Sequence, residues 1–146
     1  MFTTVVRQLK QISARFAMAV HVLSLIAVTP NGCTGDYIAC SVNTNPVVIR
    51  KLMGMLKKAG LVDVRPGVGG ATLRKEPDQI TLLDVYRAVG AAEENRLFRI
   101  HEKPNIDCLV GRNIEQALQK ELREAQSAME RRLAETTLGQ LISRFQ

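Results

Sequence analysis

Several features that mark other classes of protein are missing from this 146-residue sequence. No apolar run approaches the ~20 residues that a membrane-spanning helix needs. The first residues, MFTTVVRQLKQ, lack the basic start, apolar block and small-residue cleavage site of a secretory signal peptide. There are only three cysteines, without close spacing, which fits a reducing compartment better than a disulfide framework. We therefore expect a cytoplasmic protein that does not contact membranes.

The residue sets of common catalytic and metal sites are also missing. The two histidines lie in different regions, and no Ser/His/Asp set, nucleotide-binding glycine loop or isolated pair of acids stands out. The glycines of GVGG (67–70) lack the Lys-Ser/Thr partner of a phosphate-binding loop. The potential metal ligands of segment 101–108 match no standard zinc spacing (His101, Glu102, Asp107 and Cys108). These absences argue against an enzyme and against a metal site.

What the sequence does have is an uneven distribution of positive charge. The formal net charge is +6. Residues 1–80 contain ten Lys or Arg against four Asp or Glu, whereas residues 81–146 contain ten of each. The excess lies in the first half, which indicates a half that binds a polyanion and a neutral half with another role. On charge alone, the alternative is basic residues scattered for solubility.

The pattern of apolar residues and turn signals predicts a winged helix-turn-helix in residues 1–90. Helical spacing and capping residues predict helices over 12–28, 34–42, 46–58 and 81–90. Between the last two, LVDVRPGVGGATLRK (61–75) has two short strand-like pieces around a glycine-rich tip, as in a β-hairpin. This is the element order of a winged helix-turn-helix. The expected fold class is mainly α with a small β-hairpin wing.

The helix expected over 46–58 divides its residues between two faces. Asn45 is its expected cap and Pro46 its first residue, where a missing N–H costs nothing. One face is apolar (Val48, Leu52, Met55, Leu56 and Ala59), and the other carries all the bases and no acid (Val47, Arg50, Lys51, Gly54, Lys57 and Lys58). The apolar face would pack on the two preceding helices. The basic face is left for the major groove of DNA, which admits one α-helix.

The side chains around this basic face predict a DNA-binding site. Arg50 is the candidate to read a guanine, because its fork of N–H groups matches the two acceptors of that base. Lys51, Lys57 and Lys58 are expected to bind phosphates, which position a protein without reading sequence. The other candidates lie before the helix, in its first turn or beside the wing tip (Asn43, Thr44, Asn45, Val47, Arg65, Arg74 and Lys75). An acidic protein is the alternative partner for the same face.

The rest of the sequence predicts dimerisation. Residues 91–112 have no regular pattern, and residues 113–146 contain a long helix up to 135 and a last short helix over 136–145. Apolar residues of the long helix are spaced 4, 4, 3, 4 and 4 apart, close to a coiled-coil seam (Ile114, Leu118, Leu122, Ala125, Met129 and Leu133). A lone small domain would leave this seam exposed, so we expect a homodimer.

Five stretches of the chain resemble one known family. They are ISARFAMAVHVLSLI, SVNTNPVVIRKLMGMLKKAGLV, PGVGGATL, ITLLDVYRAV and HEKPN, the last followed by a Cys, a Gly and an Ile. These motifs are similar to the Rrf-two family of bacterial transcriptional regulators, and most to its YwnA-like members, over about residues 12–145. The resemblance implies a homodimeric winged-helix protein that binds double-stranded DNA at a palindromic operator, usually as a repressor. It also implies dimerisation through the long helix.

The cysteines depart from the pattern of the family's iron–sulfur members. Those members hold a cluster on three cysteines before the dimerisation helix, whereas residues 91–112 contain only Cys108. No iron–sulfur cluster or other cofactor is therefore expected. Cys108 is either a reactive sensor whose pKa His101 lowers, or a small buried packing residue. Cys33, in a turn, is expected to be exposed and to be the partner thiol of such a sensor. Cys40 is expected in the core.

Overall fold

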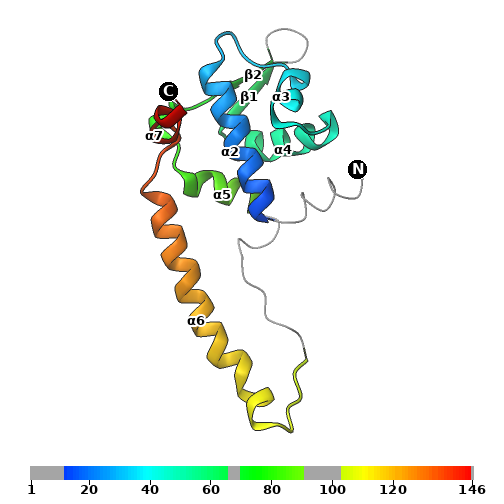
Figure 1. Cartoon of the computed structure of the whole chain (residues 1–146), viewed down its shortest axis with the longest axis vertical. Helices are drawn as coiled ribbons and strands as arrows, with labels where there is room; N and C mark the ends of the chain where they lie inside the picture. The colour runs from blue at the N-terminus through cyan, green and yellow to red at the C-terminus, as the bar shows by residue number, and fades with distance from the viewer. Residues whose placement is uncertain (1–11, 66–69, 91–102, 146) are drawn as a thin grey trace.

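A computed structural model describes residues 12–65, 70–90 and 103–145 of the chain (Figure 1). In chain order, these residues form α2 (Ile12–Val28), α3 (Gly35–Val42), α4 (Pro46–Lys58), β1 (Val62–Arg65), β2 (Gly70–Leu73), α5 (Leu82–Gly90), α6 (Leu109–Ala134) and α7 (Leu138–Ile142). Short 3-10 helices precede α5 (Pro77–Gln79) and follow α7 (Ser143–Phe145). The expected fold class is confirmed, because the described elements are helices and one two-stranded antiparallel hairpin in winged helix-turn-helix order.

Caps on both sides of a short turn define the helix-turn-helix. The Thr34 side chain caps the start of α3. Asn43 ends that helix in the left-handed region, with φ 60°, a conformation that Asn adopts more readily than most residues. The side-chain oxygen of Asn45 then accepts a hydrogen bond from the Val48 N–H (3.1 Å), and Pro46 opens α4. The bounds of α4, its cap and its first residue are those that the sequence predicts.

The apolar side of α4 packs against α2, α3 and α5. Val48, Leu52 and Leu56 are buried as expected, and Met55 is half-buried. Ala59 is exposed, contrary to expectation, because it forms the C-cap instead of a further inward turn. Each fully buried aliphatic side chain contributes about 1.5–3 kcal/mol relative to exposure. This burial fixes the rotation of α4 about its own axis.

The wing is joined to the helix-turn-helix through its second strand. β1 and β2 pair antiparallel, with Arg65 opposite Gly70. The Cys33 N–H, in the turn before α3, donates to the Ala71 carbonyl at 3.1 Å, and the Ala71 N–H donates to the Cys33 carbonyl at 2.7 Å. Gly70 has φ +66°, and a Cβ there would overlap the Cys33 carbonyl. Glycine is therefore required where the wing meets this turn.

Two expectations about cysteines are wrong. Cys33 is only 2% exposed, because its backbone pairs with β2 and its side chain joins the hydrophobic core. Cys40 is exposed, because α3 directs Ile38 and Ala39 into the core and leaves the next position outside. The accessible thiol in this half of the chain is thus Cys40.

The C-terminal residues return to the winged-helix core. Leu138 is fully buried in the core cluster, and its N–H donates to the Ile80 carbonyl at 2.7 Å. The Leu82 N–H donates to the Thr136 carbonyl at 2.9 Å. The sequence groups residues 136–145 with the long helix, but α7 packs on the first part of the chain. The three-part division of the chain stays a prediction.

α6 projects away from the rest of the described structure (Figure 1). It begins at Leu109 instead of 113, because the Arg112 N–H already donates to the Cys108 carbonyl at 2.9 Å. Its 26 residues correspond to a length of about 39 Å. None of its side chains is buried, and it meets the body at α5, where the Gln126 amide donates to the Tyr86 hydroxyl at 2.9 Å. No described helix, α6 included, combines the length and apolar character needed to cross a membrane.

Candidate nucleic-acid interface

The outer side of α4 is an exposed surface that carries positive charge only. Its four bases, Arg50, Lys51, Lys57 and Lys58, are all exposed, and the helix contains no acid. In the described part of the chain, none of the four forms an ion pair. Arg50 and Lys57 are seven residues apart, as are Lys51 and Lys58, so each pair lies on one side of the helix about two turns apart. These charges are available to an anion outside the chain.

The polar residues before α4 differ in what they offer a ligand. Asn43 is exposed. Thr44 is half-buried, and its hydroxyl oxygen is buried without a hydrogen-bond partner among the described residues. Asn45 uses its side-chain oxygen to cap Val48, which leaves its amide N–H groups as donors. Asn43 therefore presents its side chain most freely, together with Val47 in the first turn of α4, which is 54% exposed.

The three bases of the wing that are expected to bind DNA lie at opposite ends of the β-hairpin. Arg65 is the last residue of β1, beside the tip residues 66–69, which lie outside the described part of the chain. Arg74 and Lys75 follow β2 at the opposite end, where the Arg74 N–H donates to the Leu61 carbonyl. All three are exposed. The expectation that they flank the tip is wrong for Arg74 and Lys75, because antiparallel pairing returns the end of β2 to the start of β1.

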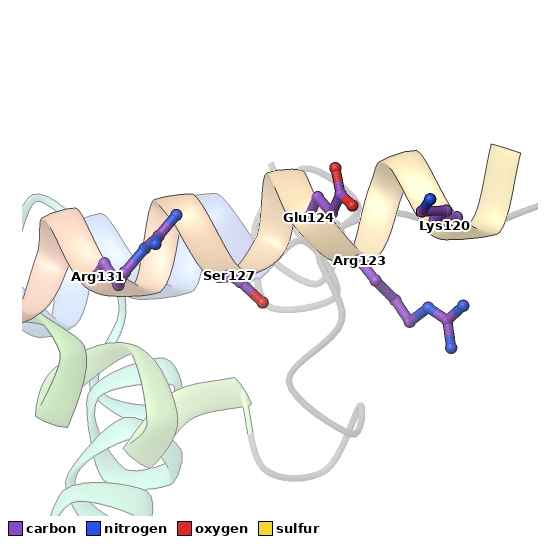
Figure 2. A pocket seen from close by; sticks show the side chains of 5 residues that line it. All are labelled: Lys120, Arg123, Glu124, Ser127 and Arg131. Atoms are coloured by element: carbon purple, nitrogen blue, oxygen red, sulfur yellow. The ribbon is translucent and has the colours of Figure 1, made fainter.

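α6 has an apolar side and a charged side. The expected seam residues are half-buried or exposed (Ile114, Leu118, Leu122, Ala125, Met129 and Leu133). A shallow hollow runs along α6. Figure 2 shows the five side chains that line it, Lys120, Arg123, Glu124, Ser127 and Arg131. At about 100° per residue, these residues lie opposite the seam. None of the six seam side chains is fully buried within the described chain, so the apolar side keeps exposed surface for another chain.

Cys108 occupies the N-cap position of α6 and is exposed. Its thiol makes no regular capping hydrogen bond. The backbone N–H groups of Gly111 and, less strongly, of Val110 nevertheless favour the thiolate and lower the pKa of Cys108 below its usual value, against a small opposing effect of desolvation. The thiolate is the reactive form of cysteine. His101, the expected neighbour, lies outside the described residues, and the buried Cys33 is not an accessible partner.

Comparison with protein families gives one match over most of the chain. Residues 12–144 match the Rrf2 family, described as an iron-dependent transcriptional regulator. Iron–sulfur clusters need several thiolates close together. The three cysteines lie in the turn before α3, on α3 and before α6, and among the described residues no three His, Cys, Asp or Glu side chains gather to hold a metal ion. The described residues therefore do not fit an iron centre, and the absence of a cluster stays a prediction.

Individual relatives agree with this match. The chain is 46% identical to YwnA of Bacillus subtilis (strain 168), named as an HTH-type transcriptional regulator, over 90% of this chain and 97% of YwnA. A crystal structure named as that of a DNA-binding protein is 41% identical, with a TM-score of 0.70 over 88% of this chain and 98% of that chain. CymR of Staphylococcus aureus is 22% identical and has a TM-score of 0.64, over 88% of this chain and 94% of CymR. The fold, the family match and the identity to YwnA show that this chain belongs to the Rrf2 family of transcriptional regulators.

Proposed function

We propose that this Rrf2-family regulator is a homodimer that binds double-stranded DNA at a palindromic operator and represses transcription in the cytoplasm. Its family makes it a regulator and not an enzyme. The observation that carries the proposal is the exposed basic side of α4, whose other side is buried in the core. A groove about 12 Å wide admits one helix, and its phosphates supply the anions that the four bases lack among the described residues.

Each base of α4 has a role that follows from its chemistry. The Arg50 guanidinium presents two parallel N–H groups to the O6 and N7 acceptors of a guanine. Lys51, Lys57 and Lys58 carry single ammonium groups that bind phosphates and set the position of the helix. Asn43 and the amide of Asn45, just before the helix, are placed to donate to the same backbone. Arg65 would extend these contacts from the wing.

The apolar side of α6 supports a dimer. A twofold dimer uses the same surface of both chains, and its symmetry matches that of a palindromic operator. The two recognition helices then have to meet major grooves about one turn of DNA apart, ~34–36 Å. Pairing of the two α6 seams would bury the apolar side chains and would hold both copies of α4 at a fixed separation.

The proposed signal is oxidation of Cys108. The thiolate attacks one oxygen of a peroxide, the O–O bond breaks, and a sulfenic acid and hydroxide form, which the solvent protonates to water. The two electrons pass from sulfur to the peroxide. Cys108 is the N-cap residue of α6, so added bulk and polarity there would disturb the helix that sets the separation of the DNA-binding domains. The exposed position and lowered pKa of this thiol support the proposal.

Arg50→Ala and Lys57→Ala should weaken operator binding in different ways. Loss of the bidentate base contact should cost about 1–3 kcal/mol and relax specificity at one position, because other bases then bind equally well. Removal of a phosphate contact should weaken binding to all sequences and reduce the salt slope by about one unit. Binding isotherms on an operator and its single-base variants distinguish the two, with Arg123→Ala on α6 as the control. Unchanged base preference in Arg50→Ala would show that Arg50 does not read DNA.

Glutamates in the seam of α6 should separate the dimer. Combining Leu122→Glu with Met129→Glu places two charges where apolar side chains should meet, so analytical ultracentrifugation should show monomers and tight operator binding should disappear. The matched control combines Lys120→Glu with Ser127→Glu on the charged side shown in Figure 2 and should remain dimeric. A wild-type protein that is already monomeric at micromolar concentration would contradict the dimer.

Mild peroxide or diamide should lower operator affinity through Cys108. The wild type and Cys40→Ser should both lose affinity, whereas Cys108→Ser should keep it, because Cys108 is exposed at the start of the long helix and its pKa is lowered. Fluorescence anisotropy before and after treatment measures the change. Equal loss in the wild type and Cys108→Ser, or no loss in either, would remove Cys108 as the sensor.

A further inference from the structure

Gly54 is a glycine that the fold itself does not require. It lies inside α4, where glycine is among the least favourable residues because of its conformational entropy. Its backbone is not in the left-handed region, and a Cβ at this position would meet no atom within 4 Å. Gly60 and Gly70 differ, because both have positive φ, and at Gly70 a Cβ would overlap the Cys33 backbone. No neighbour in the described part of the chain therefore accounts for the missing side chain at Gly54.

The position of Gly54 is the middle of the basic side of α4. Val47 lies seven residues before it, on the same side of the helix and about two turns away. Arg50 and Lys51 lie between the two along the helix, one on either side of the line that joins them. Both ends of this line are exposed, and Val47 is 54% exposed. Along the centre of the basic side, Val47 offers only a short apolar side chain and Gly54 offers none. The longer Arg and Lys side chains project further on both flanks of this line.

We propose that α4 comes closest to the operator along this line, with the Gly54 Cα against the floor of the major groove, where a Cβ would not fit. The inference rests on the proposed DNA-binding function and deepens it. A helix with its side chains is about 10–12 Å across and nearly fills a major groove about 12 Å wide, so one missing side chain sets how deep it lies. Glycine commonly occurs where a backbone approaches a ligand closely. The flanking lysines, Lys57 on one side and Lys51 and Lys58 on the other, suit the phosphates of the two groove walls.

This close approach predicts opposite effects of Gly54→Ala on stability and on binding. The free protein should become more stable, with a melting temperature about 2–4 °C higher, because alanine favours the helix and has open space around it. Affinity for a duplex selected by the wild type from a random 30-base-pair pool should fall about tenfold, because the methyl group forces the helix out of the groove. Thermal unfolding and fluorescence anisotropy measure the two effects.

The control is Ala59→Ser, which adds one atom at the exposed C-cap that follows the last residue of α4 and should leave affinity unchanged. Wild-type affinity of Gly54→Ala for the selected duplex would overturn the inference and leave the DNA-binding function standing. A lower melting temperature together with weaker binding would also overturn it, because the weaker binding would then come from a damaged fold. If the wild type selects no duplex and binds random DNA without salt dependence, the proposed function and the inference both fail.

Discussion

The arrangement of this protein depends on the burial of the apolar side of α4. Leu52 and Leu56 are fully buried, and Val48 and Ile49 nearly so. Rotating the helix to bury its bases would expose these four side chains, at a cost of about 1.5–3 kcal/mol each. That cost is comparable with the whole free energy of unfolding of a domain of this size. The bases on the other side are therefore held outward by this packing, since none of them forms an ion pair with the residues that the structure describes. The free cationic surface that suits this Rrf2 protein to DNA is a consequence of that core.

The remaining elements set how this surface is presented. The backbone pairing of Cys33 with Ala71 ties the wing to the turn before α3. On the other side of the core, Tyr86 of α5 contacts Phe16 of α2 edge-on, with ring centroids 6.3 Å apart, and accepts the Gln126 hydrogen bond from α6. Tyr86 thus touches both the body and the projecting helix. A change in the direction of α6 can therefore reach α5 and α2, which pack on α4, through the contacts of Tyr86.

Features encoded by neighbouring residues could be predicted from the sequence. The turn chemistry of Asn45 and Pro46 and the positive φ of Gly60 fix the ends of α4 locally, and the 3.6-residue period fixes its outer side. Features that depend on pairing between distant segments could not be predicted. The burial of Cys33 requires its pairing with β2, and the place of Leu138 in the core requires the chain to return along Ile80. The position of Arg74 and Lys75 away from the wing tip depends on hairpin register, which local sequence does not show.

We infer that the outer side of α4 meets DNA phosphates. The most direct measurement is the affinity of the wild-type protein for a random-sequence duplex as a function of salt, repeated with a variant in which Arg50, Lys51, Lys57 and Lys58 are all glutamine. The logarithm of the wild-type binding constant should fall linearly with the logarithm of salt concentration, and the variant's slope should be smaller by about 0.9 for each phosphate that it no longer neutralises. Equal slopes for the two proteins, or binding that does not respond to salt, would show that these four side chains do not contact DNA phosphates.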